Sequence, residues 1–167
     1  PERRIARVGG GATLGDLDTA THAHGLATTA GVYPGTGVAG LTLGGGYGWL
    51  RRKYGLACDN LLSAQVACAD GQVRTASADE SPDLFWALRG GGGNFGIVTS
   101  FTFRLHPVGP IVAFAGLFYP LTDAPALLRA LREYADAAPD EVTSEAILAA
   151  STMPGDPHLP EPVHGER

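Results

Sequence analysis

This sequence of 167 residues has few cysteines, no excess of basic residues and no long apolar run. Its two cysteines, Cys58 and Cys68, lie outside any Cys-x-x-Cys motif, so a disulfide framework is excluded and two free thiols are expected. The net charge is −5 and the densest basic run is Arg51–Lys53, which argues against a nucleic-acid partner. No stretch of 18 apolar residues occurs, so no membrane partner is expected.

Both ends of the chain look cut. The sequence starts at Pro1 without methionine, inside an apparent strand, and closes in the Pro-rich polar run MPGDPHLPEPVHGER. No signal peptide is recognisable, and the cytoplasm is favoured over secretion. The sequence gives no indication of the oligomeric state.

Glycine is abundant, with 24 residues gathered mainly in three clusters: Gly9–Gly11, Gly31–Gly48 and Gly90–Gly96. Each cluster falls between expected regular elements. Glycine allows positive φ and lets backbone N–H groups approach a ligand closely, which suits phosphate. Tight turns and close packing are the alternative explanation for any single cluster. Three clusters in one small domain favour an extended, phosphate-bearing ligand.

Two common phosphate-binding motifs are excluded. Residues Gly91, Gly93 and Gly96 match the spacing of the dinucleotide fingerprint Gly-x-Gly-x-x-Gly. That fingerprint needs a strand before it and a helix after it, whereas the pattern here predicts a helix before it and a strand after it. The P-loop motif is also absent. A Rossmann nicotinamide site and a P-loop nucleotide site are therefore rejected.

Periodicity and turn signals predict a mixture of helices and strands. A hairpin is expected at Asp70–Gly71, and the mixture with hairpins indicates an α+β fold without a regular βαβ repeat. Strands are expected at 5–8, 26–30, 62–69, 72–76, 96–105, 111–119 and 142–150. Helices are expected from Thr13 to a stop at Gly25, over 49–54, from Ser81 to Gly90, and over 123–137.

Three finer expectations concern side chains. In the strand at 96–105, alternation places Ile97, Thr99, Phe101, Phe103 and Leu105 on one face and Val98, Ser100, Thr102 and Arg104 on the other. The hydroxyls of Ser81 and Thr122 are expected to cap the helices that follow them. In the last helix, Leu127, Leu128, Leu131 and Tyr134 are expected to point inward.

Five segments carry a more specific resemblance: VGGGATLGDL (8–17), GVYPGTGVAGLTLGGGYGWLRRKYGLACDNL (31–61), ADG (69–71), SPDLFWALRGGGGNFGIVTSF (81–101) and RLHPV (104–108). In this order they closely resemble the vanillyl-alcohol-oxidase-type flavoproteins, in the berberine-bridge-enzyme-like branch. The string GVAGLTLGGG resembles bacterial members. The resemblance covers roughly two thirds of the chain, which then looks like a fragment.

The resemblance implies an FAD-binding domain of two α+β subdomains, the first largely missing, with FAD stretched between them. Residues 1–108 would be a partial FAD-binding domain, and 109–167 the beginning of a substrate domain. The parent would be an FAD-dependent oxidase of a small organic alcohol, sugar, amine or alkaloid, with O2 as acceptor. The alternative is a truncated or non-catalytic remnant that binds FAD weakly or not at all.

The resemblance also assigns cofactor-binding residues: Gly31, Tyr33, Thr36, Gly37, Gly40, Thr42, Gly45, Gly48, Gly96, Ile97 and Val98. The glycine-rich segment would pass the flavin ring and then the diphosphate, and the strand start at 96–98 would meet adenine. Tyr33 stands where many plant and fungal members carry the cysteine that bonds flavin C6. Tyr33 either shapes the substrate side of the flavin ring or packs at a subdomain interface.

No metal ligand set and no catalytic residue is assigned. The family's tethering histidine belongs to an upstream motif that is absent here, and none of His22, His24, His106, His158 and His164 has a matching context. His22 and His24 lie two apart on a helix and point away from each other, so a shared metal is not expected. The family's usual catalytic bases would lie beyond Arg167.

Overall fold

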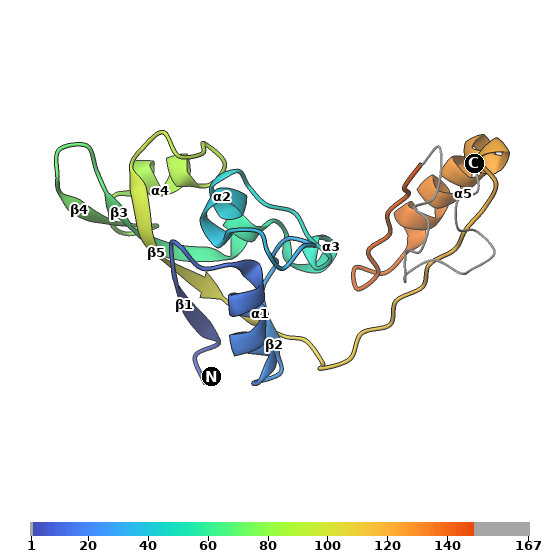
Figure 1. Ribbon diagram of the computed structural model, residues 1–167, viewed down its shortest axis with the longest axis horizontal. Helices are drawn as coiled ribbons and strands as arrows, with labels where there is room; N and C mark the ends of the chain where they lie inside the picture. Colours follow the sequence, from blue (N-terminus) through green and yellow to red (C-terminus); the bar gives the residue numbers. More distant parts are fainter. Residues whose placement is uncertain (1, 149–167) are drawn as a thin grey trace. The chain divides into compact units, whose positions relative to one another are not determined.

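The structure is a computed structural model that describes residues 2–148. Contacts divide the chain into two compact units, Pro1–Val112 and Ala113–Arg167, and each is described by itself. The first unit contains β1 (Ile5–Gly9), α1 (Leu14–His22), β2 (Leu26–Ala27), α2 (Val38–Leu43), α3 (Arg51–Tyr54), η1 (Ala57–Asn60), β3 (Leu61–Ala67), β4 (Val73–Ser77), α4 (Pro82–Leu88), β5 (Ile97–Arg104) and β6 (His106–Pro107) (Figure 1).

A four-stranded antiparallel sheet in the order β1-β5-β3-β4 forms the centre of this unit. The expected hairpin at Asp70–Gly71 is confirmed, because β3 pairs with β4 and Gly71 adopts φ +78°. The expected strand at 26–30 is shorter than predicted. Only Leu26 and Ala27 are extended as β2, which pairs with β6 in a separate two-stranded sheet.

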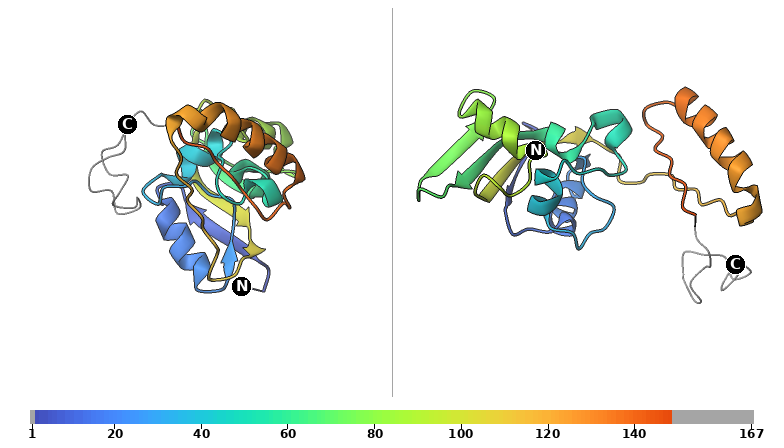
Figure 2. Two further views of the ribbon diagram at one scale, coloured as in Figure 1. Left: turned by 90° about the vertical axis from the view of Figure 1, so that its right-hand side faces the viewer. Right: turned by 90° about the horizontal axis from the view of Figure 1, so that it is seen from above.

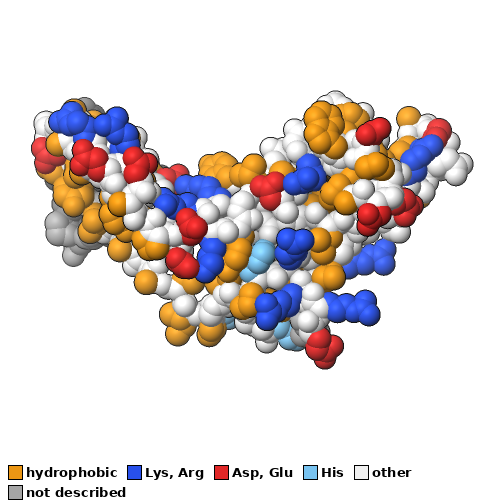
Figure 3. Space-filling view, turned by 180° about the vertical axis from the view of Figure 1, so that it is seen from behind, with side chains coloured by type: hydrophobic (Ala, Val, Ile, Leu, Met, Phe, Trp, Pro, Cys, Tyr) orange, Lys and Arg blue, Asp and Glu red, His pale blue; other side chains and the backbone are white. Residues whose placement is uncertain are grey.

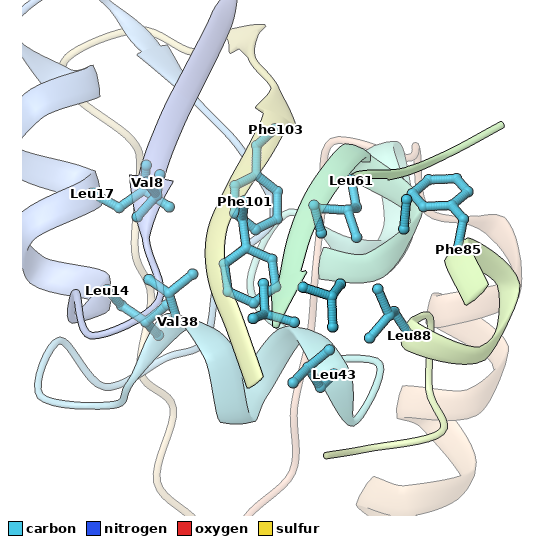
Figure 4. Packing of buried hydrophobic residues seen from close by; sticks show 14 residues of the cluster. Val8, Leu14, Leu17, Val38, Leu43, Leu61, Phe85, Leu88, Phe101 and Phe103 are labelled. Carbon is cyan, nitrogen blue, oxygen red and sulfur yellow. The ribbon is translucent and has the colours of Figure 1, made fainter. Parts of the chain in front are cut away.

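One face of the four-stranded sheet packs against α1, α2 and α4. Phe101 and Phe103 of β5 are fully buried at the centre of this core, with ring centroids 5.8 Å apart. Side chains from the three helices close over them, as Figure 4 shows for Leu14, Val38 and Leu88. This arrangement leaves the loops of the glycine clusters at the rim of the core.

The alternation expected along β5 is wrong at its first residues. Ser100 pairs with Gln65, whereas the next pair joins Val98 to Val66, so Thr99 is an extra residue in the ladder. Such a bulge changes which face the following side chains take. Val98 therefore joins Phe101 in the core at 6% exposure, whereas Ile97 is 74% exposed.

The helix-start signals have mixed outcomes. Thr13 and Asp16 form the expected start of α1 as a reciprocal capping box, and Gly25 closes this helix with φ +63°. Ser81 adopts φ +50° and its side chain makes no capping hydrogen bond, so the predicted hydroxyl cap of α4 is wrong. The predicted Thr122 cap is wrong too, because a 3₁₀ turn, η2 (Leu121–Asp123), precedes α5 and makes Asp123 the N-cap residue.

In the second unit, the expected helix is confirmed as α5 (Ala124–Ala137), a single regular helix (Figure 2). None of its residues is buried: Leu127 and Leu131 are half-buried, and Leu128 and Tyr134 are exposed, so the inward packing expected for these side chains is not found. Within residues 2–148, no helix is long and apolar enough to cross a membrane.

Two expected strands are not found. Residues 111–119 form no regular structure, because no other strand among residues 2–148 supplies the hydrogen-bond partners that a strand needs. Residues 142–148 are likewise irregular, and the last two residues of that expected strand lie outside the described part of the chain.

Candidate cofactor site at the glycine clusters

Backbone hydrogen bonds bring the three glycine clusters together around α2. The Gly10 N–H group donates to the Thr99 carbonyl at 2.9 Å, which places the first cluster against the bulge of β5. The Val38 N–H group donates to the Ala12 carbonyl at 2.9 Å, which joins the first cluster to the start of α2. The Gly92 N–H group donates to Leu43 at 2.9 Å, which joins the third cluster to the end of α2.

Sequence reasoning missed α2 itself, since the whole glycine-rich segment was expected to be a loop. The helix is only six residues long and contains Gly40, which disfavours a helix on propensity alone. Val38 and Thr42 stand four residues apart and both are 1% exposed, so their spacing was the available helical signal. This helix sets the direction of the glycine-rich segment where the other two clusters meet it.

Several of the predicted site glycines have a structural reason within the fold. A Cβ on Gly48 would stand 1.6 Å from the Ala30 carbonyl oxygen, and one on Gly31 would stand 2.8 Å from Leu14 Cδ1. Gly45 and Gly96 adopt φ of +99° and +138°, which disfavours any other residue. Close packing at Gly31 and Gly48, and positive φ at Gly45 and Gly96, therefore explain these four positions without a ligand.

Gly37 and Gly40 are different. Both are exposed, neither has a positive φ, and a Cβ at either would meet no atom within 4 Å. Glycine inside an exposed helix is less favourable than alanine by roughly 1 kcal/mol, so Gly40 costs stability with no compensation from the fold. The backbone at these two positions is open to close approach by a ligand.

The first turn of α2 also presents unused donors. The Val38 N–H group is occupied by Ala12, whereas the N–H groups of Ala39 and Gly40 have no acceptor among the described residues. They adjoin the open glycine positions. Such donors, on backbone without side-chain obstruction, fit a diphosphate, which accepts several hydrogen bonds at once.

The remaining predicted residues occupy varied environments. Tyr33 is 68% exposed, and its ring lies beside Gly35, where a Cβ would stand 2.7 Å from Cε1. Thr36 is half-buried and its N–H group donates to the Tyr33 carbonyl at 3.1 Å. Thr42 is 1% exposed, so its side chain belongs to the core. Gly96 directly precedes β5, and Ile97 and Val98 begin that strand, paired with Ala67 and Val66.

Apolar side chains are exposed along the glycine-rich segment and just after it. This set comprises Val32, Tyr33, Tyr47, Trp49 and Leu56, each at least 40% exposed. On the face shown in Figure 3, hydrophobic side chains lie among basic and acidic ones. Exposed rings such as those of Tyr33, Tyr47 and Trp49 can contact planar, weakly polar groups.

The structure also reveals polar groups that sequence reasoning missed. The hydroxyls of Thr28 and Thr29, just before Gly31, are buried without a hydrogen-bond partner. Nothing in the sequence signals this, because threonine usually finds a backbone acceptor.

Cys58 and Cys68 are free thiols, and burial raises the pKa of Cys58, which disfavours a reactive thiolate. Among the described residues, no cluster of His, Cys, Asp and Glu could hold a metal ion.

The comparisons with known proteins indicate an FAD-binding domain over part of the chain. Residues 1–77 match the family model described as an FAD binding domain. The mixed α/β fold with its antiparallel sheet is consistent with the vanillyl-alcohol-oxidase type, and FAD is the cofactor that the matches indicate.

Several known proteins are similar to this chain. The chain is 46% identical over 125 residues to the xylooligosaccharide oxidase of Thermothelomyces thermophilus, covering 74% of this chain and 25% of that protein. It is similar to the crystal structure of 6-hydroxy-D-nicotine oxidase from Arthrobacter nicotinovorans, with a TM-score of 0.72, 41% identity, and coverage of 81% and 31%. The BBE-like 1 protein of Physcomitrella patens gives a TM-score of 0.61, 46% identity, and coverage of 63% and 23%.

Two of these relatives are named as oxidases and the third as a BBE-like protein, in agreement with the resemblance. They are fungal, bacterial and plant proteins, so they do not bear out an exclusively bacterial type. The chain spans less than a third of the length of each of them.

Proposed function

We propose that this chain is part of the FAD-binding domain of an oxidase that acts on a small organic alcohol, sugar, amine or alkaloid, with O2 as acceptor. The names of the relatives support this breadth, since one oxidises xylooligosaccharides and another a hydroxylated nicotine. We extend the proposal to domain organisation, with residues 1–108 as a partial FAD-binding domain and 109–167 as the beginning of a substrate domain.

Gly40 is the observation that carries the proposal. It sits inside α2, exposed, with a negative φ and no neighbour that a methyl group would touch. Alanine would stabilise this helix by roughly 1 kcal/mol, so the glycine is best explained by a ligand that needs the space. Gly37, the N-cap residue of α2, is likewise exposed, and a Cβ there would meet no atom within 4 Å.

The chain's own residues would hold the cofactor in two ways. The N–H groups of Ala39 and Gly40 would donate to the diphosphate of FAD, and Gly37 would let the backbone approach it. Tyr33, whose ring is exposed, would lie beside the flavin ring and shape the substrate side. Tyr33 has no thiol, so this position cannot form a cysteinyl tether. When bound, FAD would accept the hydride of the substrate, and the protein would supply binding, orientation and electrostatics.

A titration with FAD tests the proposal. Quenching of flavin fluorescence by the 167-residue chain is expected to report saturable binding, and Gly40→Ala is expected to weaken it by tenfold or more, since the methyl group enters the space of the ligand. Gly109→Ala is the matched control, because its Cβ would make only an ordinary contact, 3.7 Å from Ile111 O, outside the glycine clusters. Equal affinity of the Gly40→Ala variant and the parent chain would contradict the proposed site. A chain that never quenches FAD would favour a non-catalytic remnant.

A further inference from the structure

Asn60 and His106 form a polar pair that the proposed cofactor site does not use directly. Asn60 is 2% exposed, and its Nδ2 donates to the carbonyl oxygens of Tyr54 and Leu56, each at 2.9 Å. Its Oδ1 lies 2.7 Å from Nε2 of His106 in β6. The ring of Tyr54 stacks on the His106 imidazole, with centroids 3.8 Å apart and planes 13° apart.

These contacts determine which nitrogen of His106 carries a proton. The amide nitrogen of Asn60 gives both of its N–H groups to carbonyl oxygens, so the atom that faces His106 is the acceptor oxygen. A reversed amide would set its oxygen against two carbonyl oxygens. Nε2 of His106 must therefore be the donor, and a neutral ring then has a bare Nδ1.

The segment that Asn60 holds is in turn bonded to the glycine-rich segment. The Ala57 N–H group donates to the Gly46 carbonyl at 2.7 Å, and the Cys58 N–H group donates to the Gly45 carbonyl at 2.9 Å. Gly45 and Gly46 adopt φ of +99° and +76°, a conformation that glycine accepts and that other residues disfavour. An unbroken series of hydrogen bonds and one stretch of chain thus joins β6 to the end of the glycine-rich segment.

We propose that His106 is a positioning residue: as the neutral Nε2–H tautomer it fixes Asn60, and through the 54–58 segment it fixes Gly45 and Gly46 beside the cofactor. The clause about the cofactor rests on the proposed function. The positioning itself rests only on the contacts above, and it concerns residues far apart in the sequence that no glycine motif includes.

The surroundings of His106 keep the ring neutral. Partial burial, followed by the positive charges of Arg104 and Arg4, lowers its pKa from the usual value of 6.5. On the other side of the stack, the ammonium group of Lys53 lies 5.7 Å from the centre of the Tyr54 ring. No acidic side chain pairs with His106 among the interactions found in the described residues.

The first experiment reads the tautomer in the unmodified chain. With ¹⁵N-labelled histidine, long-range ¹H–¹⁵N spectra at pH 7.5 are expected to show His106 with a protonated Nε2 and a bare Nδ1. The opposite tautomer would overturn the proposal. This measurement needs no cofactor and no variant, so a variant that fails to fold does not affect it.

The second experiment separates positioning from packing with two variants. His106→Phe keeps a flat ring for the stack but loses the donor, and His106→Gln keeps an N–H donor near the position of Nε2. Hydrogen exchange at the Ala57 and Cys58 amides is expected to accelerate about tenfold in His106→Phe, as for a lost hydrogen bond, and to stay within about threefold of the parent in His106→Gln. Equal exchange in the parent and both variants would overturn the positioning role.

Titration of the same proteins with FAD tests the cofactor clause. The affinity is expected to fall about tenfold in His106→Phe and to recover in His106→Gln. If the exchange rates change as expected and the affinities do not, the positioning stands and its link to the cofactor fails. If the parent chain itself does not bind FAD, the proposed function fails for this chain while the tautomer and exchange results still decide the positioning role.

Discussion

Gly48 and Ala30 touch so closely that only a hydrogen atom fits between the Gly48 Cα and the Ala30 carbonyl oxygen. A Cβ on Gly48 would lie 1.6 Å from that oxygen, and the atom it meets is backbone, which cannot swing aside. This contact holds the segment after β2 against the end of the glycine-rich segment. It is a feature of the fold itself and does not depend on a cofactor.

We therefore expect Gly48→Ala to destabilise the first unit by about 3 kcal/mol, the upper part of the range for overpacking. Urea unfolding followed by circular dichroism measures this. Gly11→Ala serves as the control, because a Cβ there meets nothing within 4 Å, and its midpoint should match that of the parent. A Gly48→Ala variant as stable as the control would mean that the backbone at Ala30 can yield.

The buried hydroxyl of Thr29 offers a stabilising substitution. Thr29 is 1% exposed and its Oγ1 has no partner, so Thr29→Val removes a desolvated polar group while keeping the shape. The free energy of unfolding is expected to rise by about 1 kcal/mol.

Thr21 is the matched control for that substitution. It is buried as well, but its Oγ1 donates to the Leu17 carbonyl at 3.0 Å, so Thr21→Val should lower stability by about 1 kcal/mol. Opposite signs for the two variants are the expected result. A loss of stability in Thr29→Val would show that its hydroxyl has a partner, such as an ordered water.

We predict a low pKa for the carboxyl group of Asp70, which lies in the hairpin between β3 and β4. Hydrogen bonds from Arg74 and then from the Gln72 amide, together with the charge of Arg74, lower the pKa of Asp70 to about 2. Since this pKa lies below the usual value of 3.8, the stabilising contribution is complete above pH 3.8 and is lost as the pH falls towards 2. NMR titration should return the low pKa, and Arg74→Met should raise it. An unchanged Asp70 pKa in Arg74→Met would rule out the ion pair as the main cause.

For His106 we predict that the stability of the fold depends on pH, because a charged form is disfavoured in the folded chain. Because its folded pKa is lowered from 6.5, the unfolded chain binds more protons as the pH falls below 6.5, so stability is expected to decrease there until the folded pKa is reached. Urea midpoints measured between pH 5 and 8 test this. In His106→Gln this part of the slope should vanish, whereas His22→Gln, at the end of α1, should retain it. A slope shared by the parent and His106→Gln would assign it to other groups.

Features governed by neighbours in sequence were predictable. The start of α1 follows from Thr13 and Asp16, which cap each other three residues apart, and the β3–β4 hairpin follows from Asp70–Gly71. Which side chains at the start of β5 face the core was not predictable, because the extra residue at Thr99 exists only in the pairing with β3. The helix α2 was missed for a different reason, since it is only six residues long and contains Gly40, which disfavours a helix on propensity alone.

The candidate site shows the same division. The sequence identifies the glycines, and the resemblance assigns them to FAD. Neither the sequence nor the resemblance says which of these glycines the fold itself requires. That distinction depends on the space around each Cα, which is closed at Gly48 and open at Gly40. The support from His106 and Asn60 lies outside every glycine motif, so only the contacts reveal it.

Because of the bulge at Thr99, the number of residues in β5 affects both the core and the first glycine cluster. The carbonyl of this extra residue is the acceptor for Gly10, so the same residue that shifts Val98 into the core also anchors the first glycine cluster. Deleting Thr99 would remove this bulge and at the same time release that loop. Side chains along β5 can therefore be substituted without moving the glycine loop. An insertion or a deletion in this strand would move it, because the loop is anchored at Thr99.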